Sequence, residues 1–594
     1  MPPAENPDSA LERAEATRVG RILASWKTWP SWARVNALAC VVGLLSGFLA
    51  SALFWGVHFF ERVLWQQPLH IPEGLAGTFE LGPWGMALIL GIPTFGGLAV
   101  GLILRYGCPE VAGGGTEQIL KSYHHEQALM EGRVVPFKWL ASCLTLGTGG
   151  AGGNEGPMAQ IGAATGSWLA QRLGLSTAER GLLFTAGIAG GIGAIFRAPL
   201  GGALFACELY YSNPEFESQG LLPSLIAAVS AYFVFGLVFG YQALVPGDTV
   251  FNLSLVNFVA LGLTAIICAF GAHAYVGWLE LCSKTFKKAL PQPWRPGLGG
   301  FLLGVLALGL LLVSQRWLGS DARVLAVLGE GYPILNSVVL AGAIPLLLLL
   351  VAVGKLLASG LTVGSGGSGG VFAPSMIIGG CLGALVFVGL QTLGYSDGNP
   401  KAYVLAGMAA FFAAGTACPL ASLIIITEVA QGYHILPALM WVVALGYLLR
   451  PRPGLFRDQV PGAADSPVHR AELESAFLSS RTVGQLCRRG DIATLGAGRP
   501  SAQALRALEG QRCAPVLDAQ GLYLGVGPWP LSGGRTAKTG RGLVDPRLSP
   551  LRTDQKLGEA LRVLKASQAE ELPVLDEQGS VVGLFAYHDI VAPA

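Results

Sequence analysis

The stretch that decides the fold is residues 149–160, GGAGGNEGPMAQ. Its Glu155 is the only charged residue between Lys138 and Arg172. Because the surrounding residues are apolar or small, we expect this carboxylate to lie at membrane depth, where a lone ionisable group is costly and marks a functional site by default. Pro157 suits the first turn of a helix, since its missing N–H is not needed there. Glu155 is therefore predicted to lie at a helix N-terminus, where unpaired backbone N–H groups favour negative charge.

A helix N-terminus that favours a carboxylate would equally hold a bound anion. We therefore hypothesise that Glu155 and a permeating anion compete for one electropositive place, and that protonation of Glu155 frees it. The alternative interpretation is a buried glutamate whose hydrogen bonds are satisfied by a neighbour and which has a structural role only.

The composition indicates a membrane protein with many spans. Of the 594 residues, 52% are hydrophobic and 13% are charged, whereas about 25% of the residues of a soluble domain are charged. The net charge of +2 gives no case for nucleic-acid binding. The ten cysteines form no C-x-x-C pair, so neither a zinc site nor a disulfide framework is indicated, and no cofactor is predicted. The basic residues of the N-terminal segment 1–34 argue for a cytoplasmic N-terminus.

Long runs without charge follow one another between residues 37 and 449. Several could cross the roughly 30 Å of hydrocarbon as one helix, because that needs about 20 residues. Others are short, or are interrupted by glycine and proline. Such segments are typical of half-helices whose ends meet inside the membrane.

The runs also form an internal repeat. A proline followed five residues later by a glycine recurs at an offset of 217 residues (374 − 157). A pattern of Ala-Gly, then Pro-Leu, then Glu recurs at an offset of 220 residues (428 − 208). The nearly constant spacing indicates two homologous halves with a transport site between them. An odd number of crossings in each half would make the repeats inverted. The matching positions are Pro157 and Pro374, Gly162 and Gly379, Pro199 and Pro419, and Glu208 and Glu428.

The composition changes after Arg450, where charges return. Residues 515–521, PVLDAQG, and 573–579, PVLDEQG, recur at an offset of 58 (573 − 515), each after an amphipathic helical pattern. Helix, strand, turn and strand predict a small α+β module present twice. The predicted domains are an N-terminal segment (1–34), a membrane domain (35–460), a linker (461–480) and two modules (481–541 and 542–594).

Four stretches carry the candidate chemistry: GGGTE (113–117), GNEGP (153–157), GSGGSGGVFAPS (364–375) and PGLF (453–456). Glycine lets bare backbone N–H groups face an ion. No cluster of carboxylates or histidines accompanies these stretches, so they suit an anion better than a metal. Together they resemble the CLC family of chloride channels and chloride/proton antiporters, over roughly residues 35–460. The tail is similar to a pair of CBS domains, a common addition in that family.

The resemblance implies an all-α polytopic membrane domain with inverted repeats and broken helices, followed by the α+β CBS-like pair. It implies a homodimer with one pore per subunit. We expect the protein in the plasma or inner membrane, with the C-terminus cytoplasmic like the N-terminus, on the assumption of an even number of crossings. Glu155 would be the external gating glutamate, and Lys138 would add positive potential. The residues that would bind chloride or a similar anion, mostly through the backbone, are Gly113, Gly114, Gly115, Gly156, Val371, Phe372 and Phe456.

The chain departs from the family pattern at functional positions. Gly114 stands where the family has an anion-binding serine, and Phe456 stands where it has a tyrosine. Two hydrogen bonds to the anion are thus missing, each worth roughly 1.5–3 kcal/mol, so we expect a weaker central site. Leu209 replaces the internal proton-transfer glutamate of many antiporters, which predicts weak or absent proton coupling. Glu117 replaces a proline of the first motif.

Several residues carry competing interpretations. The matched positions of Glu208 and Glu428 favour a structural role, such as capping backbone N–H groups. His124 and His125 follow a polar stretch and are predicted to be solvated. In the second CBS-like copy Asp589 matches an acid that holds ribose in copies that bind adenine nucleotides, but the accompanying hydroxyl is absent. We therefore prefer a structural or dimer-contact module and keep a bound adenine nucleotide as the alternative.

The predicted function is transport of chloride or a similar small anion through a pathway gated by Glu155, channel-like or weakly coupled to protons. Strict chloride/proton antiport is the alternative. A CBS-regulated cation carrier would need clustered intramembrane acids, which the sequence lacks. An enzyme is not predicted, because no nucleophile–base pair and no H-E-x-x-H motif are present.

Overall fold

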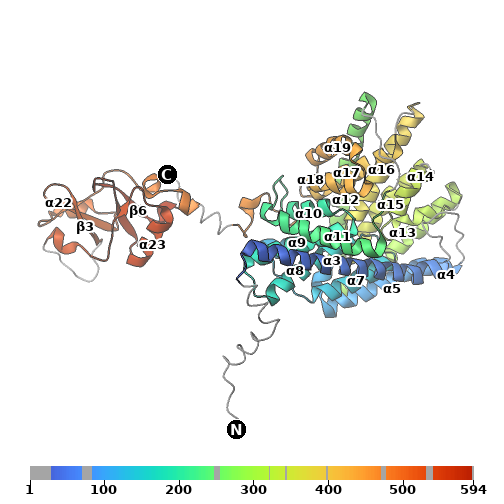
Figure 1. Ribbon diagram of the computed structural model, residues 1–594, viewed down its shortest axis with the longest axis horizontal. Helices are drawn as coiled ribbons and strands as arrows, with labels where there is room; N and C mark the ends of the chain where they lie inside the picture. The colour runs from blue at the N-terminus through green and yellow to red at the C-terminus, as the bar shows by residue number, and fades with distance from the viewer. Residues whose placement is uncertain are drawn as a thin grey trace, which may run out of the picture. The chain divides into compact units, whose positions relative to one another are not determined.

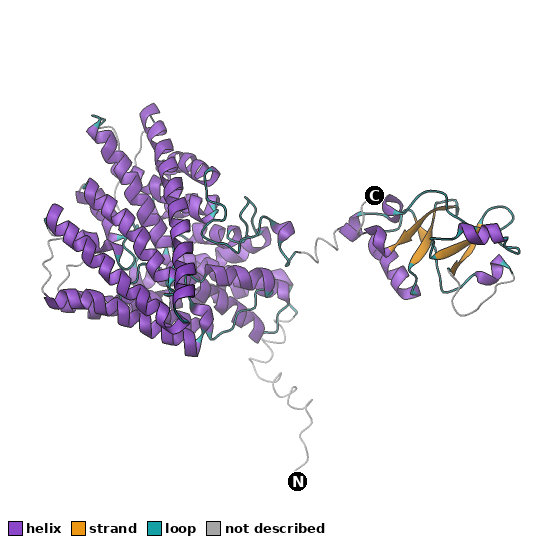
Figure 2. Ribbon diagram, turned by 180° about the vertical axis from the view of Figure 1, so that it is seen from behind, coloured by secondary structure: helices purple, strands orange, loops and turns teal. Residues whose placement is uncertain are grey.

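The computed structural model describes residues 28–69, 83–245, 254–319, 321–341, 344–395, 399–469, 477–529 and 539–590. The chain forms two compact units, Met1–Val468 and His469–Ala594 (Figure 1). The first is built from helices and the second from helices and strands (Figure 2). Residues 1–27 of the predicted N-terminal segment and 470–476 of the predicted linker lie outside the described residues.

Seven helical stretches of the described residues are long and apolar enough to cross a membrane, which confirms the multi-pass prediction. Shorter helices lie between them, as the interrupted apolar runs predicted. The helices of the first unit are α3 (Ser31–Glu61), α4 (Gln67–Leu69), α5 (Pro83–Leu102), α6 (Thr116–His125), α7 (Val134–Gly147), α8 (Glu155–Arg172), α9 (Thr177–Ile195), α10 (Pro199–Glu208), α11 (Leu221–Phe239), α12 (Leu255–Ala289), α13 (Arg295–Trp317), α14 (Pro333–Ala341), α15 (Pro345–Gly364), α16 (Phe372–Thr392), α17 (Pro400–Thr416), α18 (Pro419–Ala430) and α19 (Leu436–Leu448).

Glycine contacts hold the central helix pairs at very short range. A Cβ atom added to Gly187 of α9 would lie 2.0 Å from the carbonyl oxygen of Gly162 of α8. In the second half a Cβ atom on Gly407 of α17 would lie 2.1 Å from the carbonyl oxygen of Gly379 of α16. Both distances are far below van der Waals contact, so the backbones touch and only glycine fits, as in small-residue packing of membrane helices.

The two halves cap each other's short helices. Glu208, at the end of α10, accepts hydrogen bonds from the N–H groups of Leu420 (3.1 Å) and Ala421 (2.8 Å) at the start of α18. Glu428 of α18 does the same for Leu200 (3.2 Å) and Gly201 (2.7 Å) at the start of α10. These four bonds confirm the predicted capping role, because each carboxylate satisfies N–H groups that a helix start leaves unpaired. The two halves therefore make the same contact with each other in both directions.

The second unit contains two copies of one small sheet. In the first copy β2 (Cys513–Leu517) pairs parallel with β1 (Leu495–Gly496) and antiparallel with β3 (Tyr523–Pro528). In the second copy β5 (Glu571–Leu575) pairs in the same way with β4 (Leu551–Arg552) and β6 (Val581–Ala586). A short helix precedes each hairpin: α22 (Ala502–Ala507) and α23 (Leu557–Ser567). The predicted order of helix, strand, turn and strand is therefore confirmed in both copies.

Gly187→Ala should lower the thermal inactivation midpoint of the purified protein in detergent, because the new Cβ atom must push α8 and α9 apart. Gly181→Ala, in the same helix, is the matched control, since nothing lies within 4 Å of its Cβ position. That control should be neutral or stabilising by up to about 1 kcal/mol, the helix-propensity gain of alanine over glycine. Equal midpoints for the two variants would contradict the close packing.

Candidate anion pathway

The N-termini of α8 and α16 meet at a pair of glycines. Gly153 donates a hydrogen bond to the carbonyl oxygen of Gly370 (2.9 Å) and accepts one from its N–H group (2.8 Å), as an isolated antiparallel bridge. The two residues are equivalent in the internal repeat (370 − 153 = 217). Two positive helix ends, each equivalent to about half an elementary charge, therefore face one small volume of the protein interior.

Glu155 is the first residue of α8, and its side chain is buried at this point with 1% of its surface exposed. Oε1 accepts a hydrogen bond from the hydroxyl group of Tyr332 (2.7 Å). Oε2 is buried and has no hydrogen-bond partner among the described residues. It lies so close to Gly153 that a Cβ atom there would be 1.9 Å away. A buried carboxylate with one unsatisfied oxygen is costly, which is the condition for a group that moves or takes up a proton.

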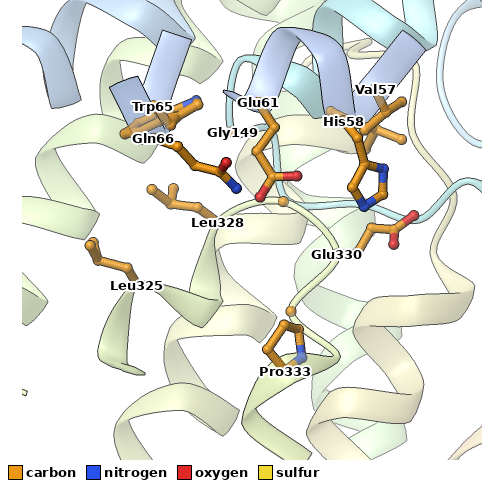
Figure 3. A pocket seen from close by; sticks show the side chains of 13 residues that line it. Val57, His58, Glu61, Trp65, Gln66, Gly149, Leu325, Leu328, Glu330 and Pro333 are labelled. Atoms are coloured by element: carbon orange, nitrogen blue, oxygen red, sulfur yellow. The ribbon is translucent and has the colours of Figure 1, made fainter. Parts of the chain in front are cut away.

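A cavity of about 160 Å³ lies between the end of α3 and the loop before α14 (Figure 3). His58 and Glu61 of α3 and Glu330 of the loop before α14 line it together with backbone of Gly149. Glu330 also accepts a hydrogen bond from the side-chain amide of Asn154, the residue before Glu155. Through Glu330 this cavity, which we call the outer cavity, contacts Asn154, the residue next to the candidate gate Glu155.

Lys355 of α15 fixes the loop that carries Glu330 and Tyr332. Its buried ammonium group donates to the carbonyl oxygens of Gly329 (2.6 Å) and Ala326 (3.2 Å) and lies within 3.4 Å of two more in the same turn. Gly331 adopts a φ of +88°, and a Cβ atom there would lie 2.6 Å from the carbonyl oxygen of Ala326. The loop thus has one geometry, set by a buried lysine and by a glycine.

A second cavity of about 370 Å³ gathers most of the predicted anion-binding residues. Its lining includes Gly113, Gly114, Gly115, Val371 and Phe456. No residue is common to the linings of this inner cavity and the outer one. Val371 of this lining follows Gly370 of the glycine pair in the chain, whereas Glu330 of the outer cavity bonds the residue before Glu155.

The inner cavity also carries charge of both signs. Lys284 and Lys287 of α12 and Arg457 supply positive charge, and Glu280 pairs with Lys284 (2.5 Å) and with Arg457. Glu117, which replaces the family proline, lines the same cavity. With Asp458, three acids and three cations line the cavity, so its side chains supply no net positive charge, and an anion there would rely on the backbone N–H groups of the glycine loop.

Other predicted residues lie behind the cavity wall. Phe372 is buried and stacks near Phe456, with ring centroids 5.8 Å apart. Gly156 packs against the carbonyl oxygen of Gly114, which a Cβ atom would approach to 2.5 Å. Lys138 is buried and donates to the carbonyl oxygen of Gly113 (2.8 Å), so it fixes the glycine loop instead of lining the cavity.

Leu209 is fully buried and lines neither cavity, and Gln459 donates to its carbonyl oxygen (2.9 Å). The prediction that His124 is solvated is wrong. Its ring is 2% exposed and contacts the hydroxyl group of Ser466 (2.9 Å) and the carbonyl oxygen of Tyr210 (3.2 Å). The long segment after α19 folds back over α6 and covers this histidine, which local polarity could not reveal. His125 is exposed, as predicted.

Glu330, Tyr332 and Lys355 escaped the sequence reasoning, although the repeat contains the signal for them. Lys355 stands 217 residues after Lys138 (355 − 138), and Glu330 stands 217 after Gly113 (330 − 113). Each lysine binds carbonyl oxygens of the loop that precedes it. Extending the offset beyond the proline and glycine pairs would have found the second loop.

Residues 96–450 match the family described as voltage gated chloride channel, which is more than half of the chain. The chain belongs to this family. A putative chloride channel protein, ClcB-like, of Ralstonia nicotianae is 31% identical over 63% of this chain and 85% of that protein. The voltage-gated ClC-type chloride channel ClcB of an Escherichia coli strain is 29% identical over 68% of this chain and 92% of that protein. Members of this family are transporters and channels, so the chain is not an enzyme.

Solved structures share the fold at lower sequence identity. A slow cyanobacterial Cl−/H+ antiporter matches 75% of this CLC chain and 98% of its own, with 21% identity and a TM-score of 0.62. A CLC-type fluoride/proton antiporter matches 73% and 98%, with 22% identity and a TM-score of 0.60. A eukaryotic CLC transporter matches 94% and 98%, with 19% identity and a TM-score of 0.55. The chain therefore has the CLC transporter fold.

Proposed function

We propose that this CLC protein moves chloride or a similar small anion between the inner and outer cavities, and that Glu155 is the gate between them. The observation that carries the proposal is the place of Glu155: a buried carboxylate, half satisfied, where two helix N-termini meet. An anion at that place would gain the same N–H groups and dipoles that now face the carboxylate. Only one negative charge can hold the place at a time.

Protonation of Glu155 ends its competition with the anion for this place. While Glu155 is charged, it occupies the positive pocket and accepts the Tyr332 hydrogen bond. A neutral carboxyl gains less from the helix dipoles and from that donor, because both interactions are stronger with a charged group. The side chain then leaves and an anion enters from the glycine loop of Gly113 to Gly115. Flux should therefore rise as the pH on the outer side falls.

The strength of proton coupling depends on whether a titratable side chain is available at the inner cavity. Leu209 offers no titratable group, which favours channel-like or weakly coupled transport. Strict antiport is the second candidate, and one observation favours it: Glu117 lines the inner cavity beside the glycine loop and supplies a carboxyl there. Recording chloride and proton flux together from liposomes separates the two, since only antiport moves protons against their gradient.

The second unit fits a CBS-like pair with a structural or dimer-contact role, in a homodimer with both termini cytoplasmic. Asp589, the candidate ribose ligand, accepts a hydrogen bond from the N–H group of Ala586 (2.7 Å) and pairs with Arg488 (3.1 Å). Arg488 also pairs with Glu571. The acid is thus engaged within the unit, which supports the structural role over a bound adenine nucleotide.

Glu155→Gln should give high chloride flux from liposomes that no longer changes with pH between about 4 and 8, because glutamine mimics the protonated side chain. Wild type should show flux that rises toward acid pH. The same protein preparations, compared for dimer mobility and thermal midpoint, control for folding. If Glu155→Gln kept the wild-type flux and pH profile, Glu155 would not be the gate.

Gly114→Ser should tighten chloride binding by about tenfold or more, measured by titration calorimetry, because a hydroxyl bond to an anion is worth roughly 1.5–3 kcal/mol. The site has room: the nearest atom to a Cβ there is 3.8 Å away. Gly115→Ser is the matched control, since its φ of +88° and a contact of 2.6 Å to Gln160 make a side chain costly. Unchanged binding in a folded Gly114→Ser variant would place the anion elsewhere.

A further inference from the structure

We propose that Glu330 and Tyr332 set the pH at which Glu155 opens the pathway, and that they act in opposite directions. The inference rests on the proposed function of Glu155 as the gate. It concerns a different element, the loop before α14, which is the repeat counterpart of the glycine loop at 113–115 (330 − 113 and 332 − 115 both give 217). In the first half this loop is bare backbone; in the second half two of its three positions carry functional groups.

Tyr332 reaches the gate by a direct hydrogen bond, and Glu330 reaches it through the neighbouring residue Asn154. The Tyr332 hydroxyl donates to Glu155 Oε1 (2.7 Å), and both side chains are buried. Glu330 accepts from the side-chain amide of Asn154, and its carboxylate is an electrostatic neighbour of Glu155. Two hydrogen bonds from the 149–152 run also tie the loop: Gly329 donates to Gly149 (3.1 Å) and accepts from Gly152 (3.2 Å). The loop therefore holds one acid and one phenol at fixed places beside the gate.

The charged groups around the two glutamates come from two elements, α15 and α3. Lys355 of α15 lies behind the loop and is an electrostatic neighbour of both glutamates. Glu61 of α3 faces Glu330 across the outer cavity, and His58 of α3 lines that cavity as well (Figure 3). Burial and Glu61 disfavour a charged Glu330, whereas Asn154 and Lys355 favour it. When Glu330 is charged, Glu155 has one negative neighbour and one hydrogen-bond donor.

The signs follow from elementary electrostatics. A negative neighbour disfavours the charged form of Glu155, so Glu330 makes the gate take up its proton at a higher pH. A donor to the carboxylate favours the charged form, so Tyr332 makes the gate take up its proton at a lower pH. Each effect is expected to be about one pH unit for a buried close neighbour. The pH midpoint of flux in the wild type is the balance between them.

The position of Glu330 on the outer cavity lets the pH act on Glu155 through Glu330. Glu330 lines this cavity, so under the proposal its protonation follows the pH of the solution that fills the cavity. When Glu330 is neutral it no longer repels a charge on Glu155. The two acids thus titrate as a coupled pair, and the pH response of the gate is broader than that of one carboxyl.

The test measures chloride flux from liposomes against pH for Glu330→Gln, Tyr332→Phe and the double variant. Glu330→Gln should move the midpoint to lower pH by about one unit, and should steepen the profile. Tyr332→Phe should move it to higher pH by about one unit. The double variant should return close to the wild-type midpoint, which a general disturbance of the fold would not produce. Glu131→Gln and Tyr433→Phe, exposed residues that line neither cavity, are the matched controls.

Glu155→Gln in each background separates the inference from the proposed function. If it removes the pH dependence everywhere while Glu330→Gln and Tyr332→Phe shift the midpoint in one common direction or not at all, the gate stands and this inference is overturned. If Glu155→Gln leaves the pH dependence intact, the proposed function itself fails. Opposite shifts that vanish with Glu155→Gln support both.

Discussion

The structure depends on one backbone contact, the reciprocal pair of hydrogen bonds between Gly153 and Gly370. Both positions require glycine, because a Cβ atom on Gly370 would lie 2.8 Å from the backbone nitrogen of Gly156 and one on Gly153 would meet the Glu155 carboxylate. The contact brings together the starts of α8 and α16, so their unpaired N–H groups converge in the protein interior. Bringing two positive ends together is unfavourable without a negative partner. The glycine contact therefore creates the demand for an anion or a carboxylate.

The surrounding scaffold repeats the same solution on both sides of this contact. Thr145 accepts from the N–H group of Ser368 (2.9 Å), and Thr362 accepts from that of Ala151 (3.0 Å). Lys138 and Lys355 bind the carbonyl oxygens of one loop each, which keeps these buried ammonium groups satisfied. Equivalent residues of the two halves exchange these bonds. The same local structure therefore occurs twice in the chain, once on each side of the glycine contact.

The two halves differ at the positions of Glu155 and of the glycine loop at 113–115. At the position of Glu155 the second half has Phe372, and at the position of Gly115 it has Tyr332 (372 − 155 and 332 − 115 both give 217). The loop at 113–115 thus keeps bare backbone, and the loop at 330–332 places a donor and a second acid next to Glu155. This asymmetry is the reason why we propose a gate on one side only of a fold built from two similar halves.

Local rules were enough for much of the site. A lone acid before Gly-Pro predicted a buried carboxylate at the start of a helix, and matched glutamates predicted reciprocal caps. The contacts of Glu330 and His124 needed the folded chain, because their partners are 176 and 342 residues away. The second unit shows the same limit: its repeat predicts the strands, but the partner of Asp589 is known only from the fold.

The central claim is that the Glu155 carboxylate and a permeating anion use one place at the meeting helix ends. Crystals of Glu155→Gln grown in bromide, measured for anomalous scattering, test it most directly. The account predicts a bromide peak beside Gly153, where the carboxylate lies in the wild type, and no such peak in wild-type crystals at neutral pH. A peak of equal height at that place in both proteins, or none in the variant, would contradict it.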